Sequence, residues 1–140
     1  MKTIYLASGN AHKLHELQTA LDQAGLPVKV SGPDSIGGMP EVEETESTFE
    51  ANALLKAHGL KEVGPSDGWF LADDSGIEID ALDGAPGVYT ADWAETPSGR
   101  NFEIAMTKAH LLLEEKNTPF PRTGRFCCTL VLAWPNGKDF

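Results

Sequence analysis

The sequence predicts an α/β domain with a mixed central β-sheet flanked by helices. Strands alternate with helices in the first half of the chain, which favours parallel pairing. A hairpin signal near the end adds antiparallel pairing, so the sheet is expected to be mixed. A length of 140 residues fits one domain, and we assign residues 1–140 to one domain.

Hydrophobic periodicity and turn residues predict the elements of the first half. Leucines that recur every three or four residues predict a helix that ends at Gly25. Ser47 and Glu50 have the spacing of a capping box, which predicts the start of a second helix. The expected elements are a strand at 3–7, a helix at 11–24, a strand at 28–30, a loop at 32–40 and a helix from residue 47.

The second half combines buried strands, a helix and a turn. The run Pro135-Asn136-Gly137 contains Asn-Gly, the strongest short hairpin signal. Three residues follow it, so we expect an incomplete form of the fold. The expected elements are a buried strand at 69–72, a half-exposed strand at 77–82, a helix at 100–116 and a strand at 125–134.

Composition limits the classes of function. The formal net charge of -10 argues against a broad nucleic-acid surface, which needs clustered Lys and Arg, but allows a small phosphorylated ligand. No apolar run approaches the roughly 20 residues of a membrane helix, and the N-terminus does not resemble a signal peptide. We therefore expect a cytoplasmic protein without a membrane partner. Cys127 and Cys128 are adjacent on a predicted strand and point to opposite faces, which argues against a disulfide.

A polar loop joins the first strand to the first helix. Such junctions direct free backbone N–H groups and a partial positive charge at an anion, and Gly9 allows close approach. Lys13 is one turn into the helix and can curl back towards a phosphate. Taken alone, this stretch favours an ordinary helix start, with Asn10 as the cap and Lys13 solvated. The candidate phosphate-binding residues are Ser8, Gly9, Asn10, Ala11, His12 and Lys13.

Two adjacent carboxylates, Asp73 and Asp74, leave the end of a predicted apolar strand and precede Ser75. Ligand sites in α/β sheets favour this end of a strand, and carboxylates suit Mg²⁺. A metal lowers the pKa of its bound water, and a nearby carboxylate can take the proton. An Asp-rich turn is the alternative. The apolar run before Asp73 favours function, because buried charges need partners or metals.

An acidic loop and the following helix form a third candidate group. Glu44 precedes the helix and could complete a metal site with Asp74. Asn52 and Lys56 are four residues apart, share one helix face and could contact phosphate oxygens. On spacing alone, a solvated loop and a surface Asn–Lys pair are favoured. The four histidines form no metal-ligand pattern, although His12 belongs to the candidate phosphate loop.

These stretches together resemble the inosine/xanthosine triphosphate pyrophosphatase family. The order and separations of four segments carry the resemblance, which covers essentially the whole chain. It implies an inosine triphosphate pyrophosphatase-like fold, a homodimer when full length, and house-cleaning hydrolysis of ITP, dITP and XTP to monophosphate and pyrophosphate with Mg²⁺. The four segments are residues 7–16 (ASGNAHKLHE), 43–57 (EETESTFEANALLKA), 72–82 (ADDSGIEIDAL) and 84–91 (GAPGVYTA).

The resemblance also implies residue roles. Residues 8–13 would line the triphosphate site, and Asp74 would be both proton acceptor and Mg²⁺ ligand. Glu44 would be a second metal ligand, with Asp73 in support. Ser75 would contact the substrate and Lys56 a phosphate.

Two departures from the family pattern matter. Asp92 stands where the family often has Arg, and the family continues past residue 140 with base-reading segments that are not in this sequence. Residues 1–140 would therefore be the N-terminal portion of the domain, with weak or no activity alone. A pyrophosphatase for pyrimidine or modified nucleotides and a non-catalytic nucleotide-binding fragment remain the alternatives. A Rossmann dinucleotide site is excluded, because no Gly-x-Gly-x-x-Gly follows the first strand.

Overall fold

The structure is a computed structural model that describes residues 2–137, 139 and 140. It divides into two compact units. Unit 1 comprises Met1–Asp73 and Thr129–Phe140, and unit 2 comprises Asp74–Cys128. Two long strands, β3 (Trp69–Ile79) and β6 (Gly124–Ala133), contribute residues to both units.

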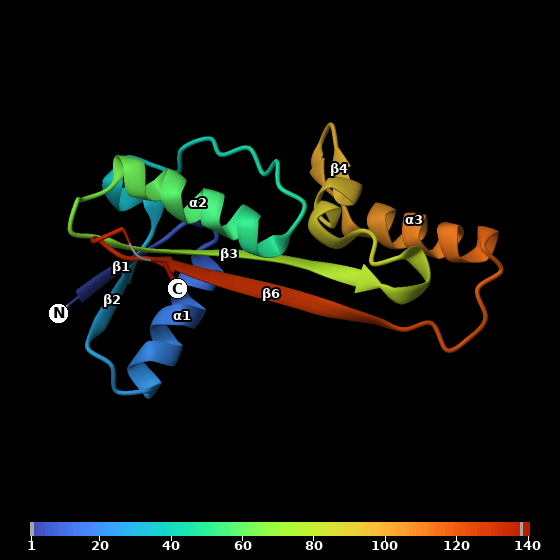
Figure 1. The fold of residues 1–140 in the computed structure, drawn as a ribbon, viewed down its shortest axis with the longest axis horizontal. Helices are drawn as coiled ribbons and strands as arrows, with labels where there is room; N and C mark the ends of the chain where they lie inside the picture. Colours follow the sequence, from blue (N-terminus) through green and yellow to red (C-terminus); the bar gives the residue numbers. More distant parts are fainter. Residues whose placement is uncertain (1, 138) are drawn as a thin grey trace. The chain divides into compact units, whose positions relative to one another are not determined.

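A four-stranded sheet has the order β2-β1-β3-β6. Strand β1 (Lys2–Leu6) pairs in parallel with β2 (Val28–Ser31) and with β3. Parallel neighbours need crossover connections, and the helices α1 (Ala11–Gln23) and α2 (Phe49–Val63) belong to them. Figure 1 shows the arrowheads of β3 and β6 pointing in opposite directions. The expected α/β fold with a mixed sheet and flanking helices is confirmed.

Helix α2 packs on one face of the sheet in unit 1, and α1 lies on the other (Figure 1). Two small alanines of α2 let the helix approach the sheet, where Leu60 and Phe70 are fully buried. Gly64 and Gly68 border the Phe70 ring, and a Cβ at either position would come within 2.7 Å of it. The core cluster consists of Ala7, Ala53, Ala57, Leu60, Phe70, Ala72, Val131 and Ala133.

Both predicted helices of unit 1 form, and one cap differs from the prediction. Asn10 caps α1, as its side chain accepts a hydrogen bond from the His12 N–H at 2.9 Å. The capping box at Ser47 and Glu50 is wrong, because Thr48 is the cap of α2 and accepts from the Ala51 N–H. Ser47 and Thr48 both carry a hydroxyl group that could cap the helix. The course of the preceding loop decides which of them does so.

The acidic segment after Ala72 is a strand and not a turn. Residues 69–79 form one continuous strand, and a short 3₁₀ helix, Asp80–Leu82, follows it. The expected break between two strands is therefore wrong, and so is the strand expected to extend to residue 82. Sheet pairing overrides the turn preference of Asp, Ser and Gly in this segment.

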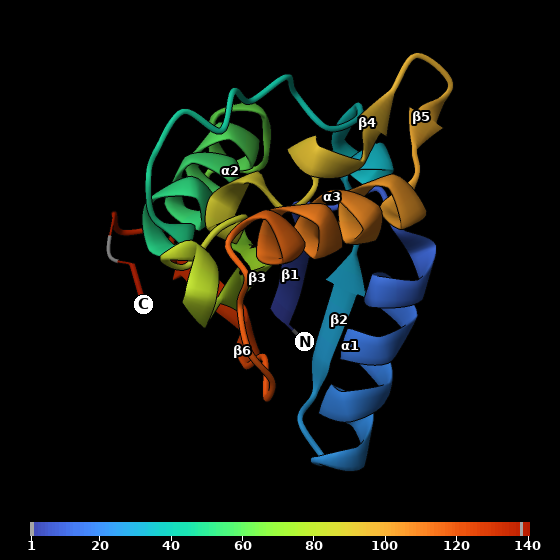
Figure 2. The ribbon, with the colours of Figure 1, turned by 90° about the vertical axis from the view of Figure 1, so that its right-hand side faces the viewer.

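In unit 2, Asn101 caps helix α3 (Phe102–Glu115), which lies within the predicted range. A small hairpin of β4 (Glu95–Thr96) and β5 (Gly99–Arg100) precedes it (Figure 2). The sequence did not predict this hairpin, because two-residue strands are shorter than the alternation that reveals a strand.

The turn at Asn136-Gly137 is confirmed by an antiparallel bridge between Ala133 and Asp139 and by a φ of +82° at Gly137. Strand β6 is one of the two outer strands of the four-stranded order, and β2 is the other. Within the described residues, no helix combines the length and apolar character that a membrane crossing requires.

Candidate functional site

The loop after β1 begins the candidate phosphate site. Ser8 and Asn10 shape it, since the Asn10 N–H donates to the Ser8 hydroxyl at 3.1 Å. Gly9, at the centre of the loop, is not among the glycines with a positive φ. No described atom beyond its chain neighbours lies within 4 Å of a Cβ added there. The fold itself therefore does not require glycine at position 9. An open approach to the backbone N–H groups before α1 is what a phosphate ligand would use.

An ion pair joins this loop region to the acidic strand. The Lys13 ammonium donates to both oxygens of Asp73, at 3.1 and 3.3 Å. The contact arises because β1 and β3 are parallel neighbours and β1 ends at Leu6, opposite Leu71, so the residues after β1 lie beside the middle of β3. The structure thus brings together two candidate groups that are 60 residues apart in the chain.

Residues 42–46, which we call the strap, lie along α2. The Lys56 ammonium is 3.1 Å from a Glu44 carboxylate oxygen, so the expected phosphate contact and the expected metal ligand are paired. The Glu46 N–H donates to Asn52 Oδ1 at 3.0 Å, and Asn52 Nδ2 donates to the Glu46 carbonyl at 3.2 Å.

These contacts correct the expected role of Asn52. Its side chain is 1% exposed and binds the strap backbone, so it does not reach a phosphate. The shared helix face of Asn52 and Lys56 was predicted, and what that face contacts was not.

The side chains of Asp73, Asp74 and Ser75 alternate along β3. Successive residues of a strand point to opposite faces, and burial follows this rule. Asp74 is 7% exposed and continues the buried face of Phe70 and Ala72, whereas Asp73 and Ser75 belong to the other face. A buried carboxylate at 74 and a lysine-paired carboxylate at 73 therefore have different environments.

The expected metal set of Glu44, Asp73 and Asp74 is not assembled as a preformed cluster. Among the described residues, no three His, Cys, Asp or Glu side chains come together to hold a metal ion. Strand alternation separates Asp73 from Asp74, and lysines pair with Asp73 and Glu44.

The donor chemistry nevertheless fits Mg²⁺. That ion uses one or two carboxylates together with waters and substrate phosphates, and does not need a complete protein cage. Glu44 is 41% exposed and accessible for this, and Asp74 offers a carboxylate in a buried position.

The histidines and cysteines do not enlarge the site. His58 Nε2 lies 3.0 Å from Asp139, at the C-terminal end of the chain. The Cys127 thiol donates to Glu78 at 2.9 Å, and this hydrogen bond, with burial and the Glu78 charge, raises the pKa of Cys127. Both cysteines are free, as expected.

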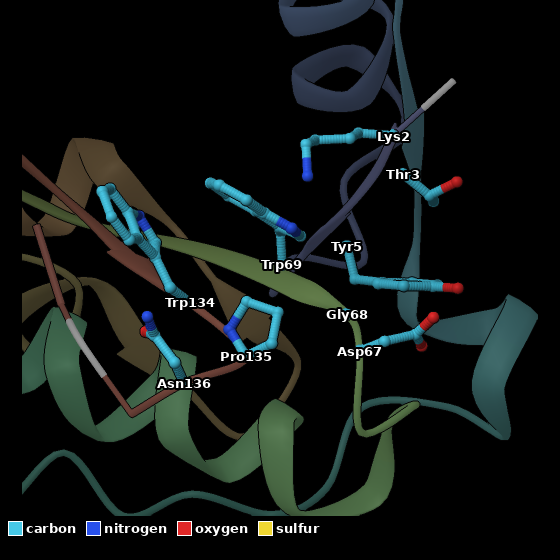
Figure 3. A pocket seen from close by; sticks show the side chains of 9 residues that line it. All are labelled: Lys2, Thr3, Tyr5, Asp67, Gly68, Trp69, Trp134, Pro135 and Asn136. Carbon is cyan, nitrogen blue, oxygen red and sulfur yellow. The ribbon is translucent and has the colours of Figure 1, made fainter.

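A hollow of about 600 Å³ in unit 1 lies away from these residues (Figure 3). Trp69 and Trp134 line it with ring centroids 5.3 Å apart, and the Lys2 ammonium lies 4.5 Å from the Trp69 centroid. Lys2 and Trp69 begin β1 and β3, whereas ligands in α/β sheets bind at the carboxyl ends of strands. The charged candidate residues beyond the carboxyl end of β1 fit a charged ligand better than this hollow does.

A parallel strand pair flanked by helices, with a polar loop, lysines and carboxylates gathered beyond the end of β1, defines an α/β protein with a charged candidate site. Residues 4–140 match the family model described as the Ham1 family. The chain therefore belongs to the Ham1 family.

Relatives and solved structures agree with this assignment. The chain is 54% identical to a dITP/XTP pyrophosphatase of Ruegeria pomeroyi over 98% of this chain and 65% of the relative. It is 46% identical to a dITP/XTP pyrophosphatase of Brucella melitensis over 96% of this chain and 60% of the relative. A HAM1 protein from Coxiella burnetii superposes with a TM-score of 0.85 at 34% identity, over 100% of this chain and 68% of that one. The chain thus spans about two thirds of these proteins.

Proposed function

We propose that this chain binds the triphosphate of aberrant purine nucleotides, ITP, dITP and XTP, together with Mg²⁺. It would be the metal- and triphosphate-binding portion of an enzyme that releases pyrophosphate and the monophosphate. The contact between Lys13 and Asp73 carries the proposal, because it links a phosphate-type loop to the acidic segment of β3. The names of the relatives in Ruegeria and Brucella support the substrate class.

The proposed roles follow the chemistry of each side chain. Backbone N–H groups of residues 8–13 would hold phosphate oxygens, with Lys13 and Lys56 as cations. Ser75 would donate to the substrate. Glu44 and Asp74 would hold Mg²⁺, with Asp73 in support, and Mg²⁺ would neutralise the triphosphate when bound.

In the proposed reaction, a water oxygen attacks the α-phosphorus and the bond from that phosphorus to the bridging oxygen breaks. Pyrophosphate leaves with the electron pair of that bond, and Asp74 accepts the proton of the water. The side chain of Asp74 is 7% exposed, so this carboxylate is largely sheltered from bulk solvent. Positioning and charge stabilisation would provide most of the rate enhancement, as in other phosphoryl transfers.

We also propose a cytoplasmic location and a homodimer for the full-length form. The net charge of -10 supports a small phosphorylated partner in preference to a nucleic acid.

The test measures pyrophosphate release from ITP, XTP, ATP and dTTP by the 140-residue protein, with and without Mg²⁺, beside nucleotide binding. Metal-dependent release that favours ITP or XTP is expected if this portion suffices. Asp74→Asn should abolish release and keep much of the binding. Asp83→Asn is the matched control, because Asp83 is exposed with a φ of +54°, which Asn tolerates.

Full activity of Asp74→Asn would refute the proposed mechanism. Binding of ITP without release would favour the non-catalytic nucleotide-binding alternative. Absence of both would refute the proposed function of this chain.

A further inference from the structure

We infer that one face of α2 sets the register of the strap, and that Asn52 and Gly59 are positioning residues that hold Glu44 in place. The inference rests on the proposed function for the role of Glu44 as a ligand. It assigns to Asn52 and Gly59 a task that differs from contact with the substrate.

Three contacts between the strap and α2 form a regular series. Glu46 is bound by Asn52, Glu44 by Lys56, and Val42 lies against Gly59, where an added Cβ would be 2.6 Å from Val42 Cγ2. From residue 42 to residue 46, every second strap residue contacts α2. Each contact lies three or four residues earlier in the helix than the one before it. Residues 52, 56 and 59 share one helix face, so the strap runs antiparallel along that face.

The residue types at 52 and 59 are poor choices for the helix itself. Asn and Gly have low helix propensity, and Asn52 is also fully buried. The contacts with the strap explain both residues. Asn offers a donor and an acceptor to the backbone of one residue, Glu46, whereas Asp lacks the donor and Ala lacks both. Gly59 leaves the space that Val42 fills.

The contacts at Asn52 and Gly59 hold the strap in place, because the ion pair between them is weak. Glu44 and Lys56 form a partly exposed ion pair, and such pairs contribute little to holding a segment in place. Residues 43–46 of the strap are exposed, so apolar burial does not fix them. The buried amide of Asn52 and the stiff, β-branched Val42 against Gly59 therefore define where Glu44 stands.

Two independent variants test the inference in the 140-residue protein. Asn52→Ala removes the two hydrogen bonds to Glu46, and Gly59→Ala displaces Val42 while it favours the helix. Both should weaken the Mg²⁺-dependent binding of inorganic tripolyphosphate by about tenfold, as loss of a group that orients a metal ligand does. Val42→Ala added to Gly59→Ala makes room again and should restore the affinity. Asn101→Ala, which removes the cap of α3, is the control and should leave it unchanged.

Two further measurements separate positioning from general stability. Amide hydrogen exchange should show a protected Glu46 N–H in the wild type and loss of that protection in Asn52→Ala. In a Glu44→Gln background, Asn52→Ala should weaken binding no further, since both changes act through Glu44. Equal weakening in both backgrounds, unchanged Glu46 exchange, or wild-type affinity of both single variants would overturn the inference.

The failure of the proposed function has a different signature. If the wild type does not bind tripolyphosphate with Mg²⁺, the proposed function is wrong. The exchange of the Glu46 amide in Asn52→Ala and Gly59→Ala then still decides whether these residues set the strap.

Discussion

The variant Gly9→Ala tests whether glycine at position 9 is needed for ligand binding or for folding. Gly9 has no positive φ, and the space around an added Cβ is open. The variant should therefore fold normally, with a gain of up to about 0.5 kcal/mol because alanine restricts the unfolded chain. If phosphate approaches the backbone of this loop, the new methyl group occupies part of that approach. We expect at least a tenfold loss of Mg²⁺–tripolyphosphate affinity, which corresponds to about 1.4 kcal/mol.

Calorimetric titration measures the affinity, and urea unfolding measures the stability of the same samples. Gly25→Ala is the matched control, because Gly25 follows α1 with a φ of +71° that strains any other residue. That variant should lose about 1 kcal/mol of stability and bind normally. Wild-type affinity of Gly9→Ala would refute the close approach of phosphate to this loop. A large loss of its stability would show that the fold needs glycine there.

Two further predictions concern the core and the Cys127 thiol. Phe70→Ala should lower the free energy of unfolding by about 3–5 kcal/mol, since the ring is fully buried, whereas Phe126→Ala, at an exposed site, should change it little in the same urea experiment. Glu78→Gln should speed alkylation of Cys127 at pH 8, because the loss of the carboxylate lowers the raised pKa of this thiol and increases its thiolate fraction. The exposed Cys128 serves as the internal reference in peptide mapping, and an unchanged Cys127 rate would contradict the assigned cause.

The sequence predicted the elements that local patterns determine. Apolar periodicity located α1, α2 and α3 to within two residues or so at most ends, and the Asn-Gly turn was confirmed. The errors lie where tertiary pairing decides. Residues 73–76 favour a turn by composition, yet they lie within the 11-residue strand β3, whose other neighbour in the sheet is β6. The choice of Thr48 over Ser47 as a cap likewise depends on the course of the preceding loop.

For the site, the sequence identified groups but not their partners. The proposal that Lys13 faces an anion came from its position one turn into α1. Its contact with Asp73 requires that β1 and β3 are neighbours, which spacing along the chain does not reveal. Whether the three expected carboxylates come together also depends on which segments are strands and which strands are neighbours. Alternation along β3 separates two of its members only if the acidic run is a strand.

The strap also shows that spacing along the chain identifies a helix face without identifying what contacts it. Spacing correctly gave Asn52 and Lys56 a common helix face, and a phosphate was a reasonable partner for both. Burial distinguishes them, since a fully buried amide must find its partners within the protein. Two signals were present in the sequence: an Asn and a Gly inside an otherwise favourable helix, seven residues apart and hence on one face. Residues that weaken a helix at such a spacing indicate that another segment lies along it, and the acidic loop before α2 was the nearest candidate.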